Sequence, residues 1–244
     1  MKKFLSKVWH ILWKTAMWFF ISSIISVIIF RWLPIPVTPL MLIRCVEQKI
    51  EGKELKLKKH WVPFDELSPN LQLAVVCSED QNFIKHNGFD FEAIDRAMEY
   101  NENHKKTRGA STISQQTAKN VFLWSGRSWV RKGLEVYFTF LIETIWNKKR
   151  IMEVYLNVIE MGDGIYGSDA AAKIYFHKSA KDLTKPEACL IAAVLPNPRK
   201  FSVLNPGAYI ISRKDWMLHQ MSLWGGVLNY EKPVEKEIQD SKKK

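Results

Sequence analysis

The chain has 244 residues, a length that suits one main domain plus a segment. Its 36 Lys and Arg residues outnumber 25 Asp and Glu residues, so the formal net charge is +11. Such a balance favours anionic partners: nucleic acid, a membrane surface or a phosphate-bearing substrate. The three cysteines lie far apart, which excludes a disulfide framework and the usual metal-ligand spacings.

The first element in chain order is a predicted membrane anchor. Residues 15–30 carry no charge before Arg31 and are mainly aromatic and branched aliphatic. Together with residues 8–13 they exceed the roughly 20 residues that a bilayer crossing needs. A cleaved secretory signal is the alternative, but no A-x-A-like site follows and the apolar run is long for a signal. We therefore predict a retained transmembrane helix over 11–32.

Basic residues at the N-terminus predict the orientation of this anchor. Lys2, Lys3 and Lys7 precede the apolar run, so the positive-inside rule places segment 1–10 in the cytoplasm. The rest of the chain is then expected in the periplasm, as a single-pass protein of the inner membrane. Residues 33–60 read as a stem that joins the anchor to the domain.

The next element is an apolar helix that ends in two acids. Ser68 and Pro69 form a helix start, and Glu79 and Asp80 stand side by side at the other end. Acids are disfavoured at a helix C-terminus by the helix dipole, which suggests that one of them is kept for chemistry. Loss of hydration beside an apolar element makes a carboxylate more basic, as a general base requires. The ordinary alternative is a solvated helix end.

A polar helix is predicted over 111–121, with Ser111 as its N-cap, after a helix over 91–99 capped by Asp90. Ser111, Gln115 and Lys119 are four residues apart and share a face of the predicted helix. Hydroxyls in the first turn with a lysine below them suit an anionic phosphate. A capped surface helix is the alternative.

A long helix is predicted to begin at Ser128. Its first two turns carry Arg131, Lys132 and Glu135. The cation precedes the acid in the Arg131–Glu135 pair, the weaker orientation, which contributes at most about 0.5 kcal/mol. Helix stability is therefore a poor reason for this trio, although a solvated charged face remains an alternative.

The C-terminal part shows further helices and no persistent two-residue alternation, so the domain is predicted to be mainly α. Its signals are a glycine-rich turn at 162–167, Ser168 as the cap of a helix over 170–176, a Thr184–Glu187 capping box before a helix over 188–195, and Asn205-Pro206 at the start of a last helix that ends near Trp224.

Four stretches resemble, in order, four motifs of the peptidoglycan glycosyltransferases. They are E-D-x-x-F-x-x-H-x-G at 79–88, the G-A-S-T-I-S-Q-Q segment that ends in Lys-Asn at 109–120, R-K-x-x-E at 131–135, and the stretch 148–157. The similarity covers about 61–228, and it implies a lysozyme-like helical glycosyltransferase domain over that range. Arg213 loosely resembles part of a weaker fifth motif.

The resemblance implies roles for the charged residues. Glu79 matches the general base and Glu135 a second essential glutamate. The cations expected to stabilise a departing diphosphate are Lys119, Arg127 and Arg131, with Lys132 in support.

The resemblance also implies a second set of roles, for polar and supporting residues. Ser111, Gln115 and Gln116 would bind donor sugar or phosphate. The residues expected to build and brace the site are Asp80, Phe83, His86, Glu153 and Asn157.

The activity implied by the resemblance is polymerisation of lipid II into glycan strands. A single displacement on an α-linked donor would invert the anomeric carbon and release undecaprenyl diphosphate. The sequence requires no cofactor; Glu135 either orients the cations or holds a divalent metal, Mg²⁺ or Mn²⁺, at the pyrophosphate, and both alternatives stay open. Expected partners are lipid II, the growing lipid-linked strand and the membrane, with other cell-wall synthesis proteins left open. The orientation of the anchor argues against nucleic acid.

The chain departs from the family pattern at a few positions. Ala110 replaces a frequent glycine, Ser114 a frequent threonine, and Leu134 a residue that is often basic in relatives. The one S-x-x-K match, at 241–244, lies in the charged tail 229–244, so no transpeptidase activity is expected.

Two rival functions remain at this point. A lytic glycosidase or transglycosylase that cuts peptidoglycan would use Glu79 as its acid, but a neutral glycan does not need the cations of the second and third motifs. A non-catalytic membrane-anchored binding module would use only the basic surface.

Overall fold

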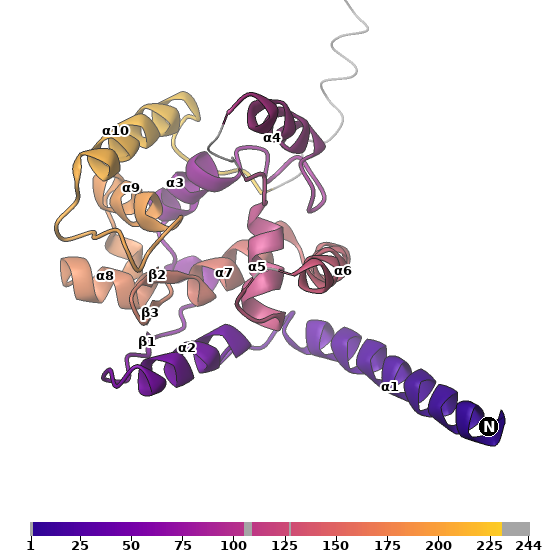
Figure 1. Ribbon diagram of the computed structural model, residues 1–244. Coiled ribbons are helices and arrows are strands. Elements are labelled where there is room, and N and C mark those ends of the chain that lie inside the picture. Colours follow the sequence, from indigo (N-terminus) through magenta and orange to yellow (C-terminus); the bar gives the residue numbers. More distant parts are fainter. Residues whose placement is uncertain (1, 105–108, 127, 231–244) are drawn as a thin grey trace, which may run out of the picture.

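The computed structural model describes residues 2–104, 109–126 and 128–230, which are mostly helical (Figure 1). The predicted mainly α class, with one apolar N-terminal helix, is confirmed. The helices are α1 (Lys2–Ile29), α2 (Pro39–Ile50), α3 (Pro69–Glu79), α4 (Phe91–Asn103), α5 (Ile113–Phe122), α6 (Trp129–Ile145), α7 (Lys148–Val158), α8 (Ser168–Phe176), α9 (Lys185–Val194) and α10 (Ala208–Leu223), with short 3-10 helices at Phe64–Glu66 and Ala180–Asp182. The strands are β1 (Lys58–Lys59), β2 (Glu160–Gly162) and β3 (Ile165–Tyr166).

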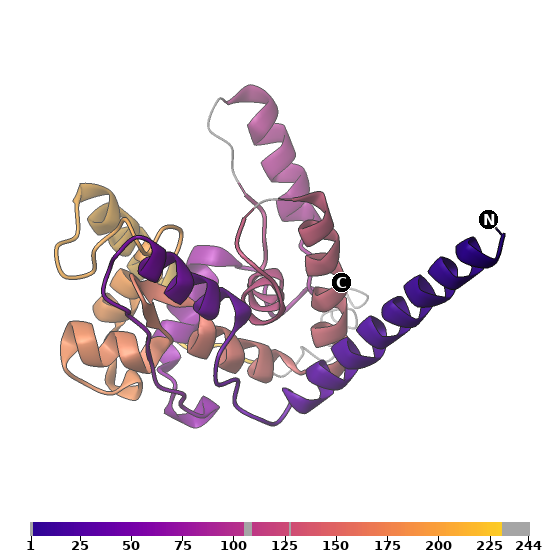
Figure 2. The same ribbon diagram turned by 60° about the horizontal axis from the view of Figure 1, so that its bottom comes forward.

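Helix α1 projects away from the remaining helices in both ribbon views (Figures 1 and 2). Its segment Lys3–Ile29 is long and apolar enough to cross a membrane, and most of it is exposed. Its C-terminal half contacts the domain, where Trp146 Nε1 donates to Val27 O at 2.7 Å and the Ser23 and Tyr137 hydroxyls lie 2.7 Å apart. The end of the anchor is therefore held against α6.

Helix α3 lies in the core of the domain. Every residue from Leu71 to Cys77 is buried, and the helix packs against α9 and α10. Ser68 Oγ accepts from Leu71 N, and Pro69 occupies the first turn, as predicted. A second group forms where α5 packs against α6 and α7. The last residue of α3, Glu79, lies where these two groups meet.

The segment predicted as a stem packs onto the domain. Helix α2 contacts α5, and its N-cap Thr38 accepts from Met41 N at 3.3 Å. Strand β1 pairs in parallel with β3, which pairs antiparallel with β2. These strands are two or three residues long, too short for the alternation that marks a strand in a sequence. Gly164, at φ +72°, allows the close approach to Lys56 beside them.

Most helix starts agree with the sequence. Confirmed are the N-caps Ser68, Asp90 and Ser128, and the capping box of Thr184 with Glu187. In each case the capping side chain or its box satisfies a backbone N–H of the first turn.

Three predicted starts are wrong by one to three residues. Thr112, not Ser111, caps α5, because Thr112 forms a capping box with Gln115 three residues later. Ser168 is the first residue of α8 rather than its cap. The last helix begins at Ala208, after the Asn205-Pro206 position.

Candidate active site

The carboxylate of Glu79 stands at the junction of α3 and α5. Glu79 is half-buried; its Oε2 accepts a hydrogen bond from Gln116 Nε2 at 3.0 Å and its Oε1 accepts from Ser78 Oγ at 3.0 Å. Each carboxylate oxygen has two lone-pair positions, so one remains on each oxygen for a further donor. Glu79 can therefore receive a proton from a substrate hydroxyl without losing these contacts.

The adjacent acid, Asp80, points inward and braces the site. Its oxygens accept from His86 Nε2 at 2.9 and 3.0 Å, and Oδ2 also accepts from Ile113 N at 2.9 Å. Because Gly88 N donates to His86 Nδ1 at 3.0 Å, the ring proton belongs on Nε2. Asp80 thus ties the loop after α3 to the N-terminus of α5, where a negative charge is favoured.

The other residues predicted to support the site contact the protein's own side chains and backbone. Phe83 is fully buried below Lys148, whose Nζ lies 4.7 Å from the ring centroid. Asn157 exchanges two hydrogen bonds of 2.9 Å with the backbone of Val62. Glu153 pairs with Arg150 at 2.9 Å.

Helix α5 supplies polar side chains with different environments. Gln116 donates to Glu79 and accepts from the Tyr155 hydroxyl at 3.1 Å, so its amide is fixed at both ends. Gln115 is buried, and its Oε1 accepts from Thr112 N at 3.0 Å within the capping box. Ser111 is exposed before the cap. The structure thus joins Gln116 to Glu79 and leaves Ser111 and Gln115 outside that contact.

The cations of α6 surround one buried acid. Glu135 is 3% exposed; its Oε2 pairs with Arg131 Nη1 at 3.0 Å and its Oε1 with Lys132 Nζ at 2.5 Å. Both carboxylate oxygens are therefore engaged by cations, which fixes the two side chains in space. Arg127, the other predicted cation, lies outside the described residues.

Lys119 lies one helix away from this trio, on α5. Burial is the main cause that lowers the pKa of its ammonium group; Arg131 and Lys132 lower it further, while Glu135 and Glu79 act in the opposite direction. Lys119 is thus electrostatically linked both to the cation cluster and to Glu79.

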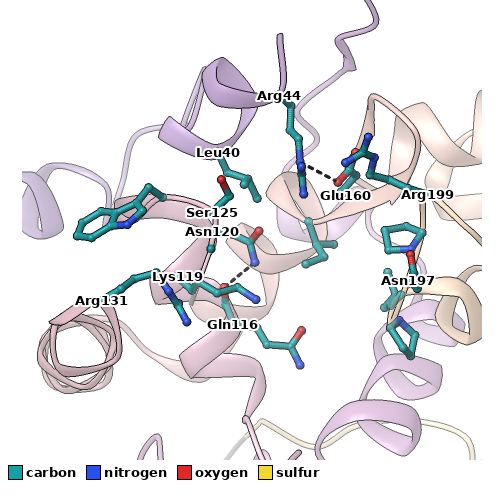
Figure 3. Close-up of a pocket in the computed structure, with 16 residues that line it drawn as sticks. Leu40, Arg44, Gln116, Lys119, Asn120, Ser125, Arg131, Glu160, Asn197 and Arg199 are labelled. Atoms are coloured by element: carbon teal, nitrogen blue, oxygen red, sulfur yellow. Dashed lines mark hydrogen bonds and ion pairs between the residues drawn. The ribbon is translucent and has the colours of Figure 1, made fainter. Parts of the chain in front are cut away.

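A cavity of about 390 Å³ opens over these groups (Figure 3). Gln116, Lys119 and Arg131 line it, and Gln116 is the side chain that also contacts Glu79. In Figure 3, Lys119 and Arg131 lie on one side of the cavity, and Arg44 and Arg199 on the other. The cavity therefore combines cations with Gln116, the side chain that donates to the Glu79 carboxylate, while Glu79 itself is not among the residues that line it.

Sequence reasoning missed a large part of this lining. Arg44 comes from α2, the segment predicted only as a stem, and Arg199 follows α9; Glu160 lies 4.0 Å from Arg44. Pro196 and Pro198 line the cavity as well, and nothing in the local sequence shows that this segment after α9 shares a cavity with α5. The other lining residues without a predicted role are Leu40, Asn120, Trp124, Ser125, Gly126, Ile159, Leu195 and Asn197.

The described residues do not form a cage for a divalent metal. No group of three or more His, Cys, Asp or Glu side chains converges anywhere in the described part of the chain. Both oxygens of Glu135 are held by Arg131 and Lys132. These contacts fit the alternative in which Glu135 orients the cations.

Comparison with known proteins identifies relatives over most of the chain. A family model described as Transglycosylase matches residues 47–222. A protein of Bdellovibrio bacteriovorus named biosynthetic peptidoglycan transglycosylase is 54% identical over 209 residues, 86% of this chain and 84% of that one. Proteins with the same name from Bacteroides thetaiotaomicron (55% identity over 224 residues, 92% and 89% of the two chains) and Pseudomonas putida (49% over 213 residues, 87% and 90%) are similar too.

Proposed function

The chain belongs to the transglycosylase family and is a peptidoglycan glycosyltransferase, and from this premise we propose that it polymerises lipid II with Glu79 as its general base. One observation carries the proposal: the carboxylate of Glu79 contacts Gln116, and Gln116 lines the same cavity as Lys119 and Arg131. A proton acceptor thus stands beside cations that can stabilise a leaving diphosphate.

The proposed reaction is a single displacement. The 4-hydroxyl of the acceptor sugar gives its proton to Glu79 while its oxygen bonds to the anomeric carbon of the donor chain. The bond from that carbon to the diphosphate oxygen breaks, and the diphosphate leaves with the electron pair. Attack on an α-linked donor from the opposite face gives a β-linked product.

Positive charge has a defined task in this reaction. Negative charge grows on the diphosphate as it departs, and fixed cations stabilise it most when they need no rearrangement. Lys119 and Arg131 line the cavity for this task, with Lys132 beside Arg131. Glu135 holds Arg131 and Lys132 in place. Arg127 and the sugar contacts of Ser111 and Gln115 belong to the proposal on the sequence resemblance alone.

A lytic enzyme is the rival, and the cation cluster argues against it. A lytic glycosidase needs an acid at the glycosidic oxygen but no cations for a neutral glycan. Here Lys119 and Arg131 line the cavity beside Gln116, the partner of Glu79.

The decisive experiment uses the full-length chain in detergent micelles with lipid II. We expect wild type to lengthen glycan strands, and Glu79→Gln to lose polymerisation while still binding lipid II. Glu66→Gln, an exposed carboxylate on the 3-10 helix Phe64–Glu66, is the matched control and should behave as wild type. Shortening of pre-made strands by wild type, or near-normal turnover by Glu79→Gln, would contradict the proposal.

The location of the domain is also part of the proposal. The exposed apolar surface of α1 supports a membrane anchor, and Lys3 and Lys7 before its apolar run support a cytoplasmic N-terminus. The catalytic domain would then face the periplasm, where lipid II is polymerised. Protease added to spheroplasts should digest the domain; a protected domain would reverse the orientation.

A further inference from the structure

One face of α10 carries a cation where apolar residues would be expected. Ile210, Met217 and Met221 are buried at helical spacing, and they fix this face of α10 against α3 and α9. Arg213 lies on the same stripe, three residues after Ile210 and four before Met217. An inward-facing arginine on such a stripe needs an acceptor on a neighbouring helix.

That acceptor is the side chain next to Glu79. Arg213 Nη2 donates to Ser78 Oγ at 2.8 Å, and Ser78 Oγ lies 3.0 Å from Glu79 Oε1. The direction of both bonds follows from chemistry, since a guanidinium can only donate and an ionised carboxylate can only accept. The single hydroxyl proton of Ser78 must therefore point at Glu79.

The other carboxylate oxygen of Glu79, Oε2, is held by a second pair of side chains, Tyr155 from α7 and Gln116 from α5. The Tyr155 hydroxyl lies 3.1 Å from Gln116 Oε1, and Gln116 Nε2 donates to Glu79 Oε2 at 3.0 Å. Complete burial raises the pKa of Tyr155 well above its usual value, so this hydroxyl keeps its proton and donates. Because the Tyr155 hydroxyl donates to the amide oxygen of Gln116, the amide nitrogen of Gln116 faces Glu79.

We propose that Ser78 and Arg213 are positioning residues, which fix the rotamer of the Glu79 carboxylate so that its free lone pairs face the acceptor hydroxyl. The proposal rests on the function proposed above, in which Glu79 is the general base. Arg213 does not touch Glu79 directly and acts through the Ser78 hydroxyl. With Gln116 and Tyr155 on the opposite side, both oxygens are held, so the carboxylate cannot rotate freely.

The environment of Arg213 supports a role beyond stability. Its Nε is buried and has no hydrogen-bond partner among the described residues. Leaving a buried donor unsatisfied costs free energy, and an apolar side chain on this stripe would avoid that cost. The contact to Ser78 is therefore the feature that an apolar residue could not supply.

The test is lipid II polymerisation by full-length Ser78→Ala, Ser78→Thr and Arg213→Met proteins. Precise orientation acts on the chemical step, so Ser78→Ala should lower kcat roughly 10- to 100-fold with KM changed less than about twofold. Ser78→Thr keeps the hydroxyl and should recover most of kcat. Ser222→Ala, an exposed serine on α10, is the matched control.

A double variant separates the relay from general destabilisation. If Arg213 acts only through Ser78, Ser78→Ala combined with Arg213→Met should be no slower than the slower single variant. Multiplied losses, a raised KM at unchanged kcat, or a Ser78→Ala kcat within twofold of wild type would overturn the proposal. Folding of each variant is checked by circular dichroism and its thermal midpoint. Wild type that fails to polymerise lipid II would instead refute the proposed function.

Discussion

Gln116 Nε2 donates a hydrogen bond of 3.0 Å to Glu79 Oε2, which joins the end of α3 to the middle of α5. The two residues are 37 positions apart in the sequence. Gln116 lines the cavity and Glu79 supplies the carboxylate, so this bond connects the proposed base to the proposed substrate site.

Replacing Gln116 with Leu should damage both activity and stability. The change removes the donor to Glu79 and leaves the buried Tyr155 hydroxyl without its acceptor, which costs about 1–3 kcal/mol. We expect kcat to fall roughly 100-fold because the carboxylate loses one of its two supports. Tyr155→Phe, which removes only the second bond of this pair, should show a smaller loss of kcat. Urea denaturation measures the loss of stability, and lipid II turnover measures the loss of kcat. An equal loss of kcat in Gln116→Leu and Tyr155→Phe would contradict the view that Gln116 acts on Glu79 directly and Tyr155 only through Gln116.

Glu135→Gln should leave the side chains of Arg131 and Lys132 on α6 without the carboxylate that holds them in place. The substitution keeps the shape of the side chain but removes the charge that holds Arg131 and Lys132. Arg131 is almost buried, so loss of its counter-charge should lower the free energy of unfolding by about 3 kcal/mol. Polymerisation should fall as well, because mobile cations stabilise the departing diphosphate less effectively.

An acid on the protein surface provides the control for this variant. Glu92→Gln removes a carboxylate that pairs with Arg96 on the exposed face of α4. Such surface pairs contribute at most about 1 kcal/mol, so stability should hardly change. Equal destabilisation by the two variants would show that Glu135 does not hold the cluster.

Lys119 should set the alkaline limit of activity. The proposed reaction uses this residue as a cation, and burial lowers the pKa of its ammonium group below that of an ordinary lysine. As pH rises, Lys119 therefore loses its proton earlier than a surface lysine, and the rate should fall with it. Lys119→Arg keeps its charge at all these pH values, so the alkaline limb of its kcat profile should move to higher pH. The exposed Lys185→Arg is the control, and an unmoved limb in Lys119→Arg would exclude Lys119 as its cause.

Local signals in the sequence predict much of the fold and the position of Glu79 at the end of α3. Capping side chains such as Ser68 and Asp90 act within one turn, so their residue types reveal the helix starts. The Thr112–Gln115 spacing also carried the true start of α5, but the adjacent Ser111 offered an equally good hydroxyl. The apolar run after Ser68 and Pro69 is a local pattern too, and it predicts that Glu79 and Asp80 lie at the C-terminal end of α3.

Contacts between distant segments could not be predicted in this way. Arg44 enters the cavity because α2 packs on α5, and Ser78 receives Arg213 because α10 packs on α3. The residues around Arg44 do not indicate which helix α2 contacts, and the apolar stripe around Arg213 indicates a buried acceptor but not which residue provides it. The inward orientation of Asp80, beside the half-exposed Glu79, likewise depends on His86 and on the N-terminus of α5.

Arg150→Met should loosen the anchor from the domain. Arg150 Nη2 donates to Phe30 O at 2.9 Å and to Leu33 O at 2.5 Å, and its guanidinium lies 5.2 Å from the Trp61 ring centroid. Charged hydrogen bonds contribute about 1.5–3 kcal/mol each, so the variant should unfold at lower urea. The connection after α1 should also be cut faster by protease in membranes. Lys149→Met changes an exposed neighbour and should match wild type; identical cutting of the two variants would contradict the role of Arg150.

Lys59 should make part of the stability depend on pH between about 8 and 10.5. Its ammonium group is held at the carbonyls of Ile35 and Pro36, and burial lowers its pKa from 10.5 to about 8. In this window the unfolded chain binds the proton and the folded chain does not, so this residue adds stability as pH rises. Below pH 8 both states are protonated and the contribution is constant.

A comparison with Lys59→Met isolates this contribution from the other lysines. Urea denaturation of both proteins at several pH values gives the difference in free energy of unfolding. That difference should move in favour of wild type as pH rises from 8 to 10.5, because only wild type has a lysine whose folded state has already lost its proton. An unchanging difference across this range would mean that Lys59 keeps its ordinary pKa in the folded protein. The junction between the end of α1 and β1 would then hold a charged rather than a neutral amine.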